Sequence, residues 1–69
     1  MRVKRINIFV TIEGKPDKLP YPKNAPLPRV GEWILNPVNT GYMLKVLDIG
    51  YQYHLNDMEI TIETKHHGR

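Results

Sequence analysis

Apolar and polar residues alternate along much of this chain, a pattern typical of β-strands with one buried and one solvent-exposed face. In residues 3–13 the even-numbered positions from Ile6 to Ile12 are apolar and their neighbours are mostly polar, with Phe9 as the exception. No helical period of convincing length occurs. The strands predicted from this alternation span residues 3–13, 30–36, 42–55 and 58–65.

The long third segment changes phase partway along. Leu44 and Val46 share one face with Tyr42, whereas Leu47, Ile49 and the alternate residues after them share the other face. A strand that changes its buried face is either bulged or bent. We therefore expect a bulge or bend in this segment, with its two halves lining different parts of one core.

The last two segments form a predicted hairpin with Asn56-Asp57 as a two-residue turn, because both residue types tolerate the left-handed conformation that such turns require. This register places Tyr53 opposite Ile60 and Tyr51 opposite Ile62 in the core. On the outer face it places His54 opposite Glu59.

The prolines at positions 16, 20, 22, 26 and 28 fall in and around a loop between the first two predicted strands. No two of them are three residues apart, so a PxxP ligand is not supported. Proline fixes φ, which makes an extended loop stiff. We expect a strap that presses Leu19, Tyr21 and Leu27 onto the core, with a partner-binding loop as the alternative because basic residues occur along it.

The fold expected from these elements is all-β: a small SH3-like, partly open barrel of four to five antiparallel strands with a proline-rich strap loop. The chain has 69 residues, enough for one domain, which we expect over residues 1–65 with a short flexible tail at 66–69. Cysteine is absent, so neither a disulfide nor a thiolate zinc site can stabilise so small a core. An efficient β core, an oligomer or both must do so.

The residue types present argue against catalysis. The chain contains no serine or cysteine, and its five glycines are dispersed rather than gathered in a phosphate-binding loop. Adjacent His66 and His67 would point in opposite directions from a strand, so they do not suggest a metal site. We expect no enzymatic activity, no cofactor and no metal.

Charge is unevenly distributed along the sequence. Residues 1–29 contain seven basic and two acidic side chains, and residues 30–69 contain three basic and five acidic ones. A basic region interleaved with aromatic residues can bind acidic partners. The candidate binding residues are Arg2, Lys4, Arg5, Phe9, Tyr21, Lys23, Arg29 and Trp33.

Three functions fit these residues. The first is a protein-binding module that forms a homo-oligomer, since Phe9 and Trp33 are apolar residues on outward faces. The second is a single-stranded nucleic-acid-binding barrel that uses the basic N-terminal third. The third is an oligomer that sequesters a small ligand. The sequence has no run of about 20 apolar residues that could cross a membrane, and a cytoplasmic location is expected.

The segment PLPRVGEWIL, followed by GYMLKVLDIGYQYHLNDMEITIE, resembles short SH3-like β-barrel proteins of phages and mobile elements. The similarity covers residues 26–64. It implies a small non-enzymatic barrel that binds a host or viral macromolecule, as an inhibitor or accessory factor.

Overall fold

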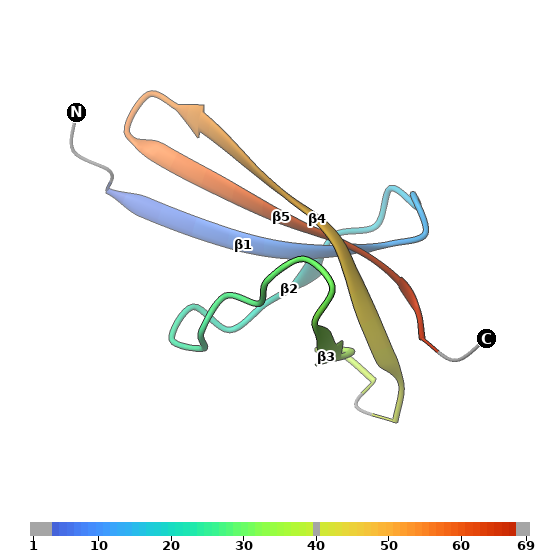
Figure 1. Ribbon diagram of the computed structural model, residues 1–69. Helices are drawn as coiled ribbons and strands as arrows, with labels where there is room; N and C mark the ends of the chain where they lie inside the picture. The colour runs from blue at the N-terminus through green and yellow to red at the C-terminus, as the bar shows by residue number, and fades with distance from the viewer. Residues whose placement is uncertain (1–3, 40, 68–69) are drawn as a thin grey trace.

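The computed structural model describes residues 4–39 and 41–67, and these form one five-stranded β-sheet (Figure 1). Among these residues there is no helix that is long and apolar enough to cross a membrane. The strands are β1 (Arg5–Ile12), β2 (Leu19–Pro20), β3 (Trp33–Leu35), β4 (Met43–His54) and β5 (Asp57–His66). The all-β prediction is confirmed. β5 includes His66, one residue beyond the expected end of the domain.

The strand order across the sheet is β2-β1-β5-β4-β3. Three of the four pairs are antiparallel, but β1 and β5 pair in parallel. The expectation of an entirely antiparallel barrel is therefore wrong for this central pair. Alternation of apolar residues fixes which side chains share a face, but it does not fix the direction in which two strands pair.

The core lies on the concave face of the curled sheet. In β1 and β5 the alternating residues face it in register, with Ile8 beside Ile60 and Val10 beside Ile62. Even Thr64 is buried there, and its hydroxyl donates to the carbonyl oxygen of Thr11 at 2.9 Å. The buried apolar residues are Ile8, Val10, Leu44, Val46, Ile60 and Ile62.

The predicted irregularity in the long strand is a β-bulge between Val46 and Asp48. Val46 pairs with Thr64 and Asp48 pairs with Glu63, so Leu47 is the extra residue. The bulge returns the following residues to the face on which Val46 lies. Both halves of β4 therefore direct alternate side chains to the concave face of the sheet.

The hairpin register differs from the prediction by two residues. The turn is Leu55-Asn56, so His54 pairs with Asp57, Tyr53 with Met58 and Tyr51 with Ile60. A two-residue difference leaves the side chains of the paired residues on their expected faces, because the strand period is two. Leu55, which was predicted as the last residue of the strand, lies in the turn instead. However, the difference moves the tyrosines toward the hairpin tip, and the prediction that they are buried in the core is wrong: Tyr51 is 57% exposed and Tyr53 is 62% exposed.

The proline-rich segment connects β2 to β3, which are the two edge strands of the sheet, so it bridges the open side of the half-barrel. Leu19 and Tyr21 pack against the core, and the Tyr21 hydroxyl donates to the carbonyl oxygen of Pro26 at 2.9 Å. Pro28 is buried. The strap is confirmed, as is the small, partly open barrel. Leu27 departs from the expectation, since it is 38% exposed.

Candidate functional site

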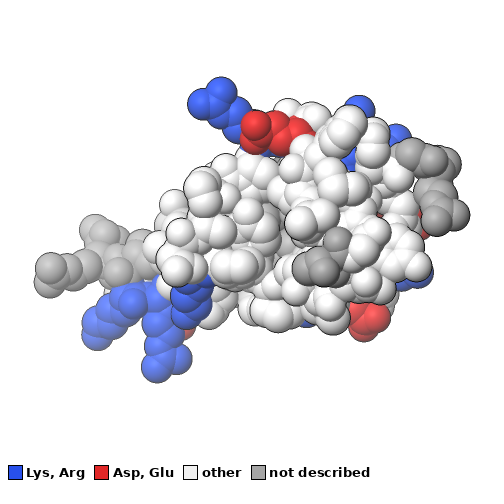
Figure 2. Space-filling model, turned by 90° about the horizontal axis from the view of Figure 1, so that it is seen from below, with Lys and Arg blue, Asp and Glu red and all other residues white. Residues whose placement is uncertain are grey.

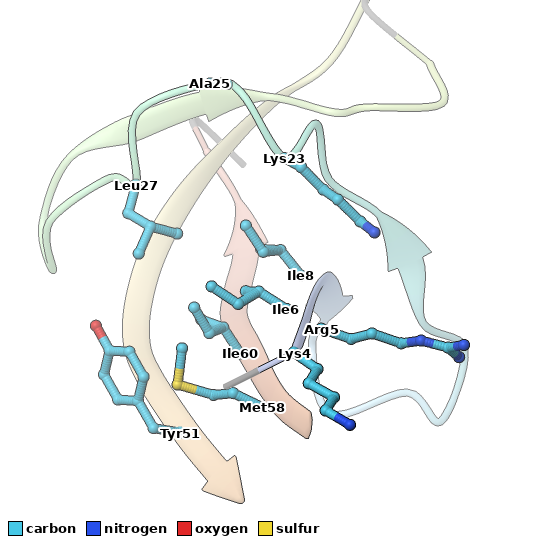
Figure 3. A pocket seen from close by; sticks show the side chains of 10 residues that line it. All are labelled: Lys4, Arg5, Ile6, Ile8, Lys23, Ala25, Leu27, Tyr51, Met58 and Ile60. Carbon is cyan, nitrogen blue, oxygen red and sulfur yellow. The ribbon is translucent and has the colours of Figure 1, made fainter. Parts of the chain in front are cut away.

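A cleft of about 610 Å³ opens on the concave face, between the strap and the end of the sheet that carries the β4–β5 hairpin. Figure 3 shows Leu27 and Tyr51 on one side of it and three basic side chains on the other, with four apolar side chains between them. The lining residues are Lys4, Arg5, Ile6, Ile8, Lys23, Ala25, Leu27, Tyr51, Met58 and Ile60.

The floor of the cleft is apolar because it continues the core beyond the strap. Ile8 and Ile60 are buried core residues, at 7% and 3% exposure. One alternating position nearer the tip, Ile6 is 40% exposed and its neighbour Met58 is only half-buried. These side chains face the same way as the core, but the strap does not cover them. The floor of the cleft is thus the part of the concave sheet face that the strap leaves open to solvent.

Lys4, Arg5 and Lys23 supply the charge, and no acidic residue lines the cleft with them. None of the three forms a salt bridge with a residue in the described ranges, where the single ion pair joins Lys18 to Glu59 at 2.9 Å. Figure 2 shows lysine and arginine side chains gathered at one end of the molecule, beside a wide uncharged surface. The cleft therefore combines an apolar floor with a positive rim, and the nearest carboxylate on β5, that of Asp57, belongs to the residue beside Arg5 just outside the cleft.

Tyr51 forms part of the cleft wall, and Tyr53 follows it on the same face of β4. Both side chains are more than half exposed. Aromatic side chains in this position provide a large contact area at low cost in conformational entropy. They extend the apolar surface from the cleft to the hairpin tip, where Leu55 is 89% exposed.

Only part of the basic set predicted from the sequence comes together. Lys4, Arg5 and Lys23 lie at the cleft, whereas Arg2 lies outside the described residues. Tyr21 belongs to the strap and packs on the core. Arg29 is exposed elsewhere on the strap, where its backbone N–H donates to the Glu32 carboxylate at 2.6 Å.

Phe9 and Trp33 lie on the convex face, away from the cleft. Phe9 is partly buried, and the Lys18 ammonium lies 5.5 Å from its ring centroid. Trp33 stacks on His67 with ring centroids 3.8 Å apart, and it remains 55% exposed. These aromatic residues already have partners within the chain, and they do not form one site with the basic residues.

Seven cleft residues were not predicted as site residues: Ile6, Ile8, Ala25, Leu27, Tyr51, Met58 and Ile60. In the sequence the strand residues among them are indistinguishable from core positions, since they continue the alternation of buried residues, and Leu27 was expected to press onto the core as part of the strap. The sequence carries no signal that separates them from the core, because the strand predicted over 30–36 is nearly as long as the one predicted over 58–65. Only the structure shows that β2 and β3 have 2 and 3 residues beside a hairpin of 12 and 10, so that one end of the hairpin extends beyond the strap.

Within residues 4–39 and 41–67, histidine and acidic side chains form no group of three or more that could hold a metal ion. Comparisons with protein-family models, with curated proteins and with solved structures found no match to this chain.

Proposed function

We propose that this protein is a non-enzymatic binding module whose cleft takes an apolar, negatively charged segment of a partner protein. The observation that carries the proposal is the lining of the cleft: an apolar floor with three basic residues on its rim and no carboxylate. Apolar side chains of a partner would gain free energy by leaving water on this floor, at roughly 25 cal/mol per Å² buried. Acidic side chains at the edge of the segment would meet Lys4, Arg5 and Lys23.

The size and composition of the cleft support a peptide-sized ligand. Its volume of about 610 Å³ lies within the range of roughly 300–1,000 Å³ that is usual for binding pockets. Tyrosine and arginine are enriched among residues that dominate protein interfaces, and one of each lines this cleft. The resemblance to small phage and mobile-element barrels agrees with an accessory or inhibitory role exerted by binding.

The test is fluorescence polarisation with a labelled peptide of about ten residues in which leucine or isoleucine alternates with glutamate. We expect saturable binding to the wild-type protein and a loss of about tenfold in affinity, or ~1.4 kcal/mol, for Lys23→Glu. Lys65→Glu is the matched control, because Lys65 is exposed outside the cleft and the net charge changes equally. Equal losses for the two variants would show that overall charge, rather than the cleft, attracts the peptide.

A second candidate is binding of single-stranded nucleic acid, favoured by the exposed Tyr51 and Tyr53 on the face that carries the basic residues. Bases stacked on aromatic side chains contribute about 1–3 kcal/mol each. A labelled thymidine oligonucleotide under the same conditions distinguishes the two functions. Tighter binding of the oligonucleotide than of the peptide, abolished in Tyr53→Ala, would assign the surface to nucleic acid.

A third candidate is a small amphipathic anion held in the cleft, which adapts the sequence-based prediction of an oligomer that sequesters a small ligand to the geometry of the cleft. Such a ligand would displace the peptide from the same floor. Native mass spectrometry of the purified protein checks this directly, since a retained ligand would appear as a fixed added mass that disappears on unfolding.

A further inference from the structure

One edge of β4 has no strand beside it over most of its length. β3 pairs only with Met43 to Lys45. Two further backbone hydrogen bonds, from the Gly31 N–H to the Val46 carbonyl and from the Val46 N–H to the Glu32 carbonyl, extend the contact by one residue. From Asp48 to His54 the strand pairs with β5 on one side, and on the other side no described residue pairs with it. An unpaired edge of seven residues is a template for another strand.

The hairpin determines which backbone groups face this edge. Residues that flank a two-residue turn exchange hydrogen bonds, so His54 bonds to Asp57, and alternate residues before it also bond to β5. The intervening residues Ile49, Tyr51 and Tyr53 therefore direct their N–H and C=O groups outward. Only the Ile49 N–H has a partner in the described chain, the Asp48 carboxylate at 2.9 Å.

We infer that a second copy of this chain pairs with the free edge of β4, antiparallel, with Tyr51 opposite Tyr51 of the second copy. This inference does not rest on the proposed function. A two-fold axis through Tyr51 places Ile49 opposite Tyr53 of the second copy. In each of these pairs, both residues direct their backbone N–H and C=O groups toward the other strand, so they can exchange hydrogen bonds. The register also uses the whole free segment from Asp48 to His54.

The side chains along this register are self-complementary. On the convex face, Asp48 lies opposite His54 of the second copy, which brings a carboxylate to an imidazole at each end of the pairing. In the dimer the Asp48 carboxylate turns from the Ile49 N–H toward that histidine, and the Ile49 N–H bonds to the second copy instead. On the concave face, tyrosine meets tyrosine or isoleucine.

The ends of the free edge carry the exposed aliphatic residues that this pairing would cover. Leu55, at 89% exposure, would reach Leu47 of the second copy, which is 46% exposed. Val30, which is 61% exposed, lies close to Leu47 of its own chain, because the N–H of the next residue, Gly31, donates a hydrogen bond to the carbonyl oxygen of Val46. Apolar contact is therefore available at both ends of the paired strands, and the two clefts would lie on one continuous concave sheet.

Sedimentation equilibrium from about 1 to about 200 µM tests this inference, since micromolar association falls within that range. We expect a reversible dimer for the wild-type protein. Tyr53→Lys should weaken it at least about tenfold by placing a charge on the paired face. Gln52→Lys is the matched control. The Gln52 side chain points to the convex face, where it lies opposite Gly50 of the second copy, so a lysine at this position should leave the dimer unchanged.

A charge exchange tests the register itself. His54→Glu places two carboxylates opposite each other and should weaken the dimer, and adding Asp48→Lys to it should restore the wild-type association. Thermal melts at the lowest concentration verify that each variant is folded. Neither Asp48 nor His54 lines the cleft, so these variants should still bind the peptide. Loss of dimerisation can therefore be distinguished from loss of the proposed binding function.

A monomer across the whole concentration range would overturn the inference. So would a dimer that Tyr53→Lys does not weaken, because it would use another face. Hydrogen exchange adds a third criterion: the Tyr51 and Tyr53 amides should be protected at high protein concentration without any ligand. Protection that appears only when a peptide is added would assign this edge to a strand of another protein and also contradict the dimer.

Discussion

Leu55 has the least expected conformation of any residue described here. Its φ is +54°, in the left-handed region that bulky side chains avoid, and its side chain is 89% exposed at the hairpin tip. The conformation costs about 1–2 kcal/mol for a residue with a Cβ atom, and the isolated chain gains no burial in return. Local strain of this kind is common at positions that contact a partner.

Leu55→Gly should therefore stabilise the monomer, by about 0.5–1 kcal/mol after the greater flexibility of glycine is deducted. Chemical denaturation at about 1 µM, below the expected range of dimerisation, measures this effect. The same substitution should weaken dimerisation, because it removes the side chain that covers Leu47 of the second copy.

Asn56→Gly is the control for that measurement, since Asn56 is not in the positive-φ region and gains no relief from glycine. It should lower stability slightly. A Leu55→Gly variant that is no more stable than wild type would show that the turn does not strain the leucine.

Two neighbouring positions on β5 distinguish core from surface. Ile60 is 3% exposed, so Ile60→Ala should cost about 2–5 kcal/mol, much of the stability of a domain this small. Glu59→Gln removes only the ion pair with Lys18, whose side chain is 48% exposed, and should cost less than about 1 kcal/mol. Thermal or urea denaturation of both variants measures the difference. A larger loss for Glu59→Gln than for Ile60→Ala would contradict the assignment of faces.

At the level of elements, the hairpin shows what sequence patterns determine and what they leave open. The alternation correctly predicted the faces of β5 and of β4 from Ile49 to Tyr53. It was wrong for Leu47, which was expected on the face of Ile49 but is the extra residue of the bulge, and for Leu55, which was expected in the strand but lies in the turn. It could not fix the register to better than two residues, because two registers that differ by two place the same side chains on the same faces. Asn56-Asp57 contains the better turn residues, yet the chain turns one residue earlier.

A pair of introduced cysteines distinguishes the two registers in a chain that has no cysteine of its own. Tyr53 and Met58 are directly opposite in the structure, and directly opposed strand residues have Cβ atoms close enough for a disulfide. We expect Tyr53→Cys with Met58→Cys to oxidise to an intramolecular disulfide, detected by mass spectrometry. Tyr53→Cys with Ile60→Cys, the pair of the alternative register, should remain reduced; the reverse result would place the turn at Asn56-Asp57.

The strap and the bulge were predictable for a different reason. Proline stiffens a segment whatever surrounds it, and a phase change within one strand requires an irregularity. The parallel pairing of β1 with β5 was not predictable, because it depends on the strap carrying the chain from one edge of the sheet to the other before β4 begins. That path is a property of the assembled fold rather than of any segment.

At the level of the whole molecule, the candidate site was only half visible in the sequence. The excess of basic residues in the first 29 positions predicted a positive surface, and Lys4, Arg5 and Lys23 do lie at the cleft. The apolar floor was not predicted, because Ile6 and Met58 have the pattern of core residues and only the limited reach of the strap leaves them open. Phe9 and Trp33 were assigned to binding by exposure alone, and the structure places them on the opposite face.

The positive rim also predicts the salt dependence of binding. The affinity for an acidic apolar peptide should fall about tenfold or more between 50 mM and 500 mM sodium chloride, because screening shortens the range of charge interactions from more than 10 Å to a few ångströms. Binding should not vanish at high salt, since the apolar floor still contributes. A salt-independent affinity would exclude a role for the basic residues, and complete loss would exclude one for the floor.

The central claim is that ligand binds on the concave face at the open end of the half-barrel. A titration followed by ¹H–¹⁵N correlation spectroscopy tests it most directly, using the uniformly labelled protein and the acidic apolar peptide. The claim predicts that the amides of Ile6, Lys23, Tyr51 and Met58 shift together with one saturation curve, while those of Trp33 and His67 do not move. Shifts centred on Trp33 and His67, with the cleft amides unchanged, would contradict it.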